Sequence, residues 1–242
     1  MKLNYQENDI KDYLKDLNNE IKILRLFSNN ENSVRFYGDY EEGNNKVIVM
    51  EKCDMNLKDY ANKRNAPFKV EEIKAKFLKM NELFKLKEHH NIIHRDLKLQ
   101  NFLVKFTNEK KTQYNLKLSD YGIGTFRLET NGIFSGMKGS LETAAPEIIL
   151  GKTKIYESIV DIFSLGIILY QLSHNLNHPF GKNEAEYLLY YKNNYENDNH
   201  IDIFFDKSIK DKDFKDLLNK MLKINPKNRL SWKEYFEHPF FK

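Results

Sequence analysis

A polar segment of eight residues in the middle of the chain constrains the fold more than any other stretch. It follows the apolar pair Ile92-Ile93, precedes a short strand-like run, and reads His94-Arg95-Asp96-Leu97-Lys98-Leu99-Gln100-Asn101. The packing of a hydrophobic core does not require so many polar groups between two apolar elements. Phosphoryl transfer does, because it needs a carboxylate for the acceptor hydroxyl, a cation for the phosphoryl charge and oxygen ligands for Mg²⁺. Asp96, Lys98 and Asn101 supply these groups.

Composition and charge exclude several classes of protein. The 242 residues are 40% hydrophobic and 31% charged, with a net charge of +4. These values are typical of a globular protein, and the scattered Lys residues indicate no nucleic-acid partner. The longest apolar run, 162–172, is too short to span a membrane. The single cysteine, Cys53, excludes an intrachain disulfide, and no N-terminal signal is visible, so we expect a cytoplasmic protein. The oligomeric state stays open.

Hydrophobic periodicity predicts one helix and several strands, followed by a mostly helical remainder. Spacings of three and four predict helices over 9–27 and 70–89, and an intervening turn predicts a hairpin of strands over 34–40 and 46–50. Further strands are expected at 103–104 and 116–118, and further helices at 57–62, 158–174, 183–194, 213–223 and 231–237. The two parts join near residues 51–54. This order predicts a two-lobed α+β fold with a ligand-binding cleft between the lobes.

Three further motifs follow the octet: Asp120-Tyr121-Gly122, Ala145-Pro146-Glu147 and Asp161-Ile162-Phe163-Ser164-Leu165-Gly166. With the octet, they resemble the eukaryotic protein kinase motifs H-R-D-L-x-x-x-N, D-F-G, A-P-E and D-x-W-S-x-G, in the same order. The resemblance covers residues 2–242. It implies a kinase-like α+β fold with a partial, truncated N-lobe over residues 1–53 and a mainly helical C-lobe over residues 54–242, together forming one domain.

The resemblance assigns chemical roles to four residues. Asp96 is expected to orient and deprotonate the acceptor hydroxyl, and Lys98 to neutralise the γ-phosphate of ATP. Asn101 and Asp120 are expected to hold Mg²⁺. A lysine two residues after the catalytic aspartate is typical of the serine/threonine type of this family. The implied substrate is therefore a serine or threonine hydroxyl of a protein.

Regulatory roles follow from the same resemblance. Ser140 follows Gly139 and is expected to hydrogen-bond the catalytic aspartate and lysine. Arg95 is expected to pair with a phosphate on the segment after residue 122. Ser135 lies nearest the usual phosphorylation position, although the alternative that no hydroxyl there is phosphorylated stays open.

Structural roles are implied for three residues. Glu147 is expected to form a buried ion pair with Arg229, near the end of the chain. Asp161 is expected to hold the backbone of the octet from below. Because a carboxylate at a helix start often caps the helix, a capping role for Asp161 stays open beside this one.

The hinge and the small lobe are expected to bind the nucleotide. Met50 is expected behind the adenine, the backbones of Glu51 and Cys53 at its edge, and Leu103 beneath the base. The alternative for Cys53 is that it serves only as a small buried apolar residue.

Glu20 resembles the helix glutamate that pairs with a phosphate-gripping lysine. Lys2 is either that lysine or an ordinary frayed terminus.

One family motif is not found in the sequence. No G-x-G-x-x-G-x-V precedes Glu20, so we expect a reduced small-lobe sheet and weaker nucleotide binding. The resemblance implies a protein serine/threonine kinase that uses ATP and Mg²⁺. The alternative is a weakly active or inactive protein-binding module of the same fold. A metal-dependent hydrolase using Asp96, Asn101 and Asp120 has no other support.

Overall fold

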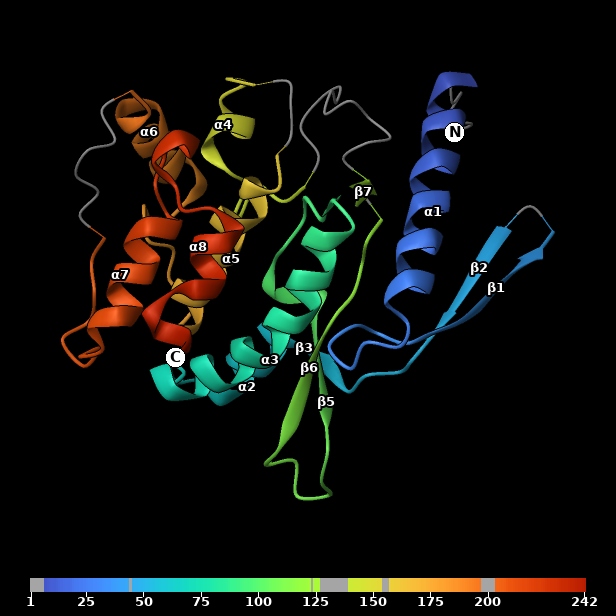
Figure 1. Ribbon diagram of the computed structural model, residues 1–242, viewed down its shortest axis with the longest axis horizontal. Helices are drawn as coiled ribbons and strands as arrows, with labels where there is room; N and C mark the ends of the chain where they lie inside the picture. The colour runs from blue at the N-terminus through green and yellow to red at the C-terminus, as the bar shows by residue number, and fades with distance from the viewer. Residues whose placement is uncertain (1–6, 44, 123, 127–138, 154–156, 197–202) are drawn as a thin grey trace.

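The structure is a computed structural model that describes residues 7–43, 45–122, 124–126, 139–153, 157–196 and 203–242. Two groups of elements are visible, a helix with a hairpin at one side and a larger, mainly helical body at the other (Figure 1). Lys2 and Ser135 lie outside the described residues, so their expected roles stay predictions.

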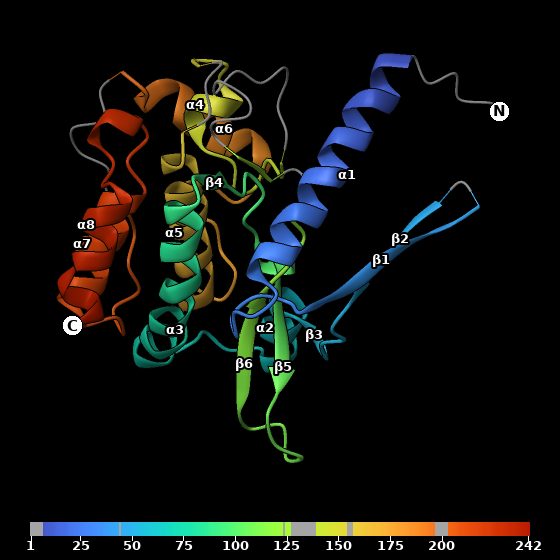
Figure 2. The same cartoon turned by 45° about the vertical axis from the view of Figure 1, so that its right-hand side comes forward.

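The smaller group consists of helix α1 (Glu7–Phe27) and the antiparallel strands β1 (Phe36–Glu42) and β2 (Asn45–Met50). The apolar residues Ile23, Leu24 and Phe27 of α1 are fully buried. Asp39 on β1 forms ion pairs with Arg25 of α1 at 2.6 Å and with Lys46 of β2 at 2.8 Å, which tie the hairpin to the helix. The hairpin projects beyond the rest of the molecule (Figure 2).

Short strands join the two groups of elements. Strands β3 (Met55–Asn56), β5 (Phe102–Phe106) and β6 (Tyr114–Leu118) form an antiparallel sheet in that order. Strand β4 (Ile92–Ile93) pairs with β7 (Thr125–Phe126). The 3₁₀ turn η1 (Leu99–Asn101) lies directly before β5, so the polar loop, defined as residues 94–101, is fixed between two paired strands.

The larger body is built around α5 (Ile159–Ser173), in which every residue from Val160 to Ser173 is buried. Such all-round burial is typical of a central helix rather than a surface helix. Helices α3 (Val70–His89) and α7 (Lys212–Met221) pack against α5. The other described elements of this body are α2 (Leu57–Arg64), α4 (Pro146–Ile149), α6 (Glu184–Asn194), η3 (Pro226–Asn228), α8 (Trp232–Glu237) and η4 (Pro239–Phe241).

The predicted fold class and its long elements are confirmed. The helices predicted over 9–27 and 70–89 appear as α1 and α3, and the predicted hairpin appears as β1 and β2. Strands β3, β4 and β7 and the short helix α4 were not predicted as elements, because two to four residues carry no measurable periodicity. No described helix has the length and apolar character needed to cross a bilayer.

Candidate active site

The start of the polar loop is held by a buried carboxylate. Asp161, fully buried in the first turn of α5, accepts a hydrogen bond from His94 N at 2.8 Å and from Arg95 N at 2.9 Å. Arg95 has a φ of +68°, which a non-glycine residue keeps only where its surroundings hold it. Capping of α5 is not the role of Asp161, because Ser158 occupies the N-cap position.

Asp96 is in contact with three of the other predicted residues. Its Oδ1 accepts a bond from Ser140 N at 2.9 Å, and its Oδ2 lies 2.5 Å from Lys98 Nζ. Lys98 Nζ also donates to Ser140 Oγ at 3.0 Å. Asn101 Nδ2 donates to the Asp96 carbonyl at 2.8 Å. The structure therefore brings Asp96, Lys98, Asn101 and Ser140 together, with the carboxylate oriented from both sides.

Gly139 permits the contact between the polar loop and Ser140. Its φ is +108°, and a Cβ at this position would lie 2.5 Å from the Arg95 carbonyl oxygen. Only glycine adopts this conformation and this close approach without strain. The segment before α4 is therefore seated directly on the backbone of the polar loop.

The end of β6 places Asp120 beside the polar loop. Ser119 donates from its amide and from its hydroxyl to the Asn101 carbonyl, at 2.9 and 3.0 Å. Asp120 follows with a φ of +61°, another strained conformation at the site.

Asn101 and Asp120 fit Mg²⁺ in the type of ligand they offer. The Asn101 amide turns its nitrogen to Asp96, which leaves its oxygen on the opposite side, and Asp120 offers a carboxylate. Among the described residues, no group of three or more His, Cys, Asp or Glu side chains could hold a metal ion. A cation here would therefore need water or phosphate oxygens as well, which Mg²⁺ usually keeps.

Glu20 of α1 faces the same region. Burial, and then the negative charge of Asp120, raises the pKa of the Glu20 carboxyl. Its Oε2 would lie 3.5 Å from a Cβ built on Gly122, so α1 reaches the Asp120-Tyr121-Gly122 turn. A cation near Asp120 would relieve the repulsion that the Asp120 charge exerts on the Glu20 carboxyl.

Tyr121 links α1 to the polar loop. Its buried ring packs between Phe27, at a centroid distance of 5.7 Å, and His94, at 5.1 Å. A buried tyrosine hydroxyl needs a hydrogen-bond partner, and Ser33 Oγ lies 3.2 Å from that of Tyr121. Burial lowers the pKa of His94, so the imidazole is neutral in this stack.

The hinge residues lie at the junction between β2 and β3. Glu51 N donates to the Arg35 carbonyl at 2.8 Å, so the Glu51 carbonyl is the group left for an adenine contact. The Glu51 carboxylate pairs with Lys117 at 3.0 Å. Burial, and then the charge of Glu51, raises the pKa of the Cys53 thiol. Met50 is 38% exposed, and Leu103 lies on β5 in register with Lys117.

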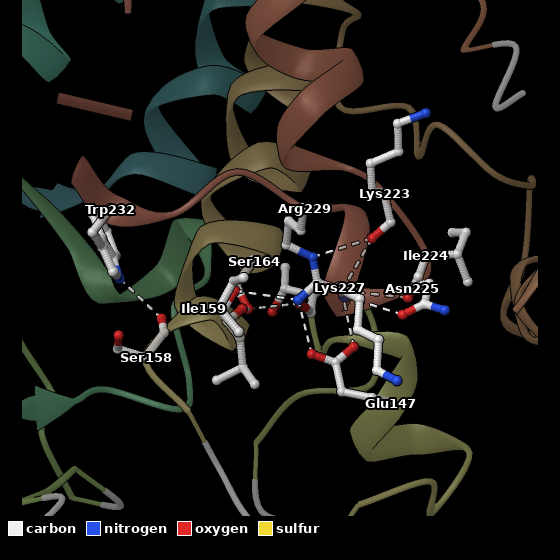
Figure 3. A network of polar contacts seen from close by, with 12 residues as sticks. Glu147, Ser158, Ile159, Ser164, Lys223, Ile224, Asn225, Lys227, Arg229 and Trp232 are labelled. Atoms are coloured by element: carbon white, nitrogen blue, oxygen red, sulfur yellow. Dashed lines mark hydrogen bonds and ion pairs between the residues drawn. The ribbon is translucent and has the colours of Figure 1, made fainter. Parts of the chain in front are cut away.

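The predicted partners Glu147 and Arg229 form a buried bidentate ion pair (Figure 3). Arg229 Nη1 and Nη2 donate to the two Glu147 oxygens at 2.8 and 2.9 Å. The guanidinium also donates to the carbonyls of Ile159, Lys223 and Ile224. This pair fixes α4 against the start of α5 and the segment after α7.

Sequence reasoning missed two residues of this region, Ser33 and Lys87. Ser33 gave no signal, because a serine in a loop is ordinary. Lys87 gave one: it follows Met80, Leu83 and Phe84 at helical spacing, on the apolar face of α3. A lysine at that position contradicts the pattern and indicates a buried partner.

A family profile described as "Protein kinase domain" matches residues 1–241. The chain belongs to the protein kinase domain family. Among curated proteins, this kinase domain is 30% identical to calcium-dependent protein kinase 19 of Arabidopsis thaliana over 94% of the chain. It is 33% identical to the serine/threonine-protein kinase ATG1b of the same plant over 93% of the chain.

A third relative is the serine/threonine-protein kinase/endoribonuclease ire-1 of Caenorhabditis elegans, 27% identical over 96% of the kinase domain. ATG1b and ire-1 are both named as serine/threonine-protein kinases. The chain spans only part of their length: 39% of the first relative, 30% of ATG1b and 24% of ire-1.

Proposed function

We propose that this kinase domain transfers the γ-phosphoryl group of ATP to serine or threonine hydroxyls of a protein. The observation that carries the proposal is the double orientation of Asp96. Asp96 Oδ1 accepts a hydrogen bond from the Ser140 amide, and Asp96 Oδ2 accepts one from Lys98 Nζ. Lys98 Nζ also donates to Ser140 Oγ. A general base must be held in a fixed geometry to accept a proton from a substrate hydroxyl.

The proposed roles follow from these positions. Asp96 orients the acceptor hydroxyl and takes its proton, while Lys98 stabilises the charge on the transferred phosphoryl group. Asn101 and Asp120 hold Mg²⁺, which when bound neutralises phosphate charge. Glu20 grips the phosphates indirectly, through a lysine for which Lys2 is the candidate.

The nucleotide base is proposed to lie against the hinge. The Glu51 carbonyl and the Cys53 backbone contact the adenine edge, with Met50 behind it and Leu103 below. In this proposal the N-lobe ends at Cys53 and the C-lobe begins at Asp54. As part of the same proposal, phosphate on Ser135 pairs with Arg95, and the domain works in the cytoplasm, where the single free thiol stays reduced.

The test is Mg²⁺-dependent transfer of labelled phosphate from ATP to a generic protein substrate, with identification of the labelled amino acid. Asp96→Asn should reduce transfer at least ~100-fold, because it removes the general base. Asp213→Asn, at an exposed position on α7, is the matched control and should leave transfer unchanged.

Nucleotide binding is measured on the same samples. Equal transfer by Asp96→Asn and by the unmodified chain would refute the enzymatic role. Nucleotide binding without any transfer would support the alternative, a kinase-fold module that binds partners.

A further inference from the structure

A lysine is buried beneath the polar loop. Lys87, in the last turn of α3, is 1% exposed. Its ammonium lies 3.1 Å from Asp161 Oδ2 and 2.8 Å from Glu88 Oε1, and it donates to the Ile92 carbonyl at 3.1 Å. The ammonium donates hydrogen bonds to Glu88 and to the Ile92 carbonyl, and its charge is paired with the Asp161 carboxylate. The buried cation is therefore fully compensated, which is the condition for tolerating it.

Lys87 is connected to the polar loop by two routes. It binds the carbonyl of Ile92, two residues before His94. It also shares Asp161 Oδ2 with the amide of His94, which lies 2.8 Å away. The remaining oxygen of Asp161 holds Arg95, whose φ is +68°. The geometry of the residue before Asp96 thus depends on a carboxylate that Lys87 neutralises.

Other groups hold Lys87 in turn. Its Nζ lies 4.6 Å from the centroid of the Trp232 ring, within the range of a cation–π interaction. Ser158 Oγ donates to the second oxygen of Glu88 at 3.0 Å. Trp232 Nε1 donates to the Ser158 carbonyl at 3.0 Å (Figure 3). We call Lys87, Glu88, Ser158, Asp161 and Trp232 the lysine cluster. It connects α3, α5 and α8.

We propose that Lys87 is a positioning residue for phosphoryl transfer, acting through Asp161 and the Ile92 carbonyl to fix the backbone that carries Asp96. The transfer part of this inference rests on the proposed function. The structural part does not, because it concerns the hydrogen bonds at His94 and Arg95 and is measured without substrate.

The first experiment follows amide hydrogen exchange in the full chain. Lys87→Met keeps a similar length but removes the charge and the donors. The amides of His94 and Arg95 should exchange about tenfold faster or more, while the β5–β6 ladder keeps its protection. Lys87→Arg, which keeps a cation, should stay within about threefold of the unmodified chain. Lys85→Met is the control, since Lys85 is exposed on the same helix and contacts Phe236.

Two exchange results would overturn the proposal. One is full protection of His94 and Arg95 in a folded Lys87→Met variant. The other is an even loss of protection along the whole chain, because that reports general destabilisation only. If the single variant Lys87→Met does not fold, the double variant Lys87→Met/Asp161→Asn is used in its place and is compared with Asp161→Asn alone. The double variant should match Asp161→Asn at both amides, and a further tenfold loss would contradict action through Asp161.

Trp232 gives a second readout, because it is the only tryptophan in the sequence. Its fluorescence emission should shift in Lys87→Met and not in Lys85→Met, since only the first removes a charge from its ring. Identical emission in all three proteins would refute the placement of the ammonium.

The kinetic experiment tests the link to transfer. Lys87→Met should lower kcat about 10- to 100-fold, as expected for a displaced catalytic group, and leave KM for ATP within about twofold. Lys87→Arg should recover most of kcat. An unchanged kcat with faster exchange at His94 would overturn the positioning role. If the unmodified chain transfers no phosphate, the proposed function fails and the exchange result still stands.

Discussion

At the scale of single residues, the site depends on close approaches that only particular side chains allow. Gly139→Ala should reduce kcat at least ~10-fold and the free energy of unfolding by about 1–3 kcal/mol, because its Cβ would meet the Arg95 carbonyl and a positive φ is strained. Urea unfolding and transfer assays measure both effects.

Gly151→Ala is the matched control for strain alone. Gly151 has a φ of +62° with no atom within 4 Å of a built Cβ. The Gly151→Ala variant should lose about 1 kcal/mol in free energy of unfolding and should keep its full transfer activity. Equal loss of activity at both glycines would show that contact with the polar loop is irrelevant.

The hydroxyl pair of Ser33 and Tyr121 makes an asymmetric prediction. Ser33→Ala leaves the buried tyrosine hydroxyl without this partner and should cost about 1–3 kcal/mol. Tyr121→Phe should cost less than about 1 kcal/mol, because Ser33 Oγ keeps its contact with the Val34 carbonyl. The double variant should have about the same free energy of unfolding as Tyr121→Phe alone. Urea denaturation of the three variants checks this order, and a Tyr121→Phe cost above that of Ser33→Ala would contradict it.

At the scale of elements, one ion pair joins α4 to the segment after α7. Arg229→Met should destabilise the chain by about 3–5 kcal/mol, because it leaves Glu147, only 2% exposed, with an uncompensated charge. Adding Glu147→Leu should recover part of this loss. Denaturant unfolding measures both variants.

An exposed ion pair provides the control. Lys152 and Glu196 lie 3.1 Å apart with side chains 45% and 75% exposed, so Lys152→Met should change stability by less than about 1 kcal/mol. A similar cost for Lys152→Met and Arg229→Met would argue against the importance of burial.

At the scale of the whole molecule, the sequence predicted more of the chemistry than of the packing. The octet and its three companion motifs named residues that the structure brings together, such as Arg95 and Asp161. The long elements α1 and α3 were predicted because their apolar faces repeat over many turns.

Contacts between distant segments escaped prediction. Nothing in the sequence connects Ser33 with Tyr121, or Gly139 with the Arg95 carbonyl, because these contacts arise only when separate elements pack. Lys87 is intermediate. Its position on an apolar helix face was visible, but its partner Asp161 was not.

The pH dependence of stability is a property of the whole chain in which His178 has a measurable share. Burial lowers the pKa of His178 to about 4, although its bond to the Glu142 carbonyl opposes this. Its Nδ1 accepts from Phe180 N at 3.2 Å, so protonation would break that bond. Between pH 6.5 and 4, the unfolded chain therefore binds a proton that the folded chain does not, and stability falls as the pH falls.

His178→Gln should reduce this loss by on the order of 1–3 kcal/mol at pH 4, relative to pH 7. Buried His94 and His174, whose pKa values are also lowered, should leave a remaining slope. Urea titrations from pH 4 to pH 7 measure the effect, with His89→Gln at an exposed position of α3 as the control. Parallel stability curves for His178→Gln and the unmodified chain would contradict a partly buried, neutral His178.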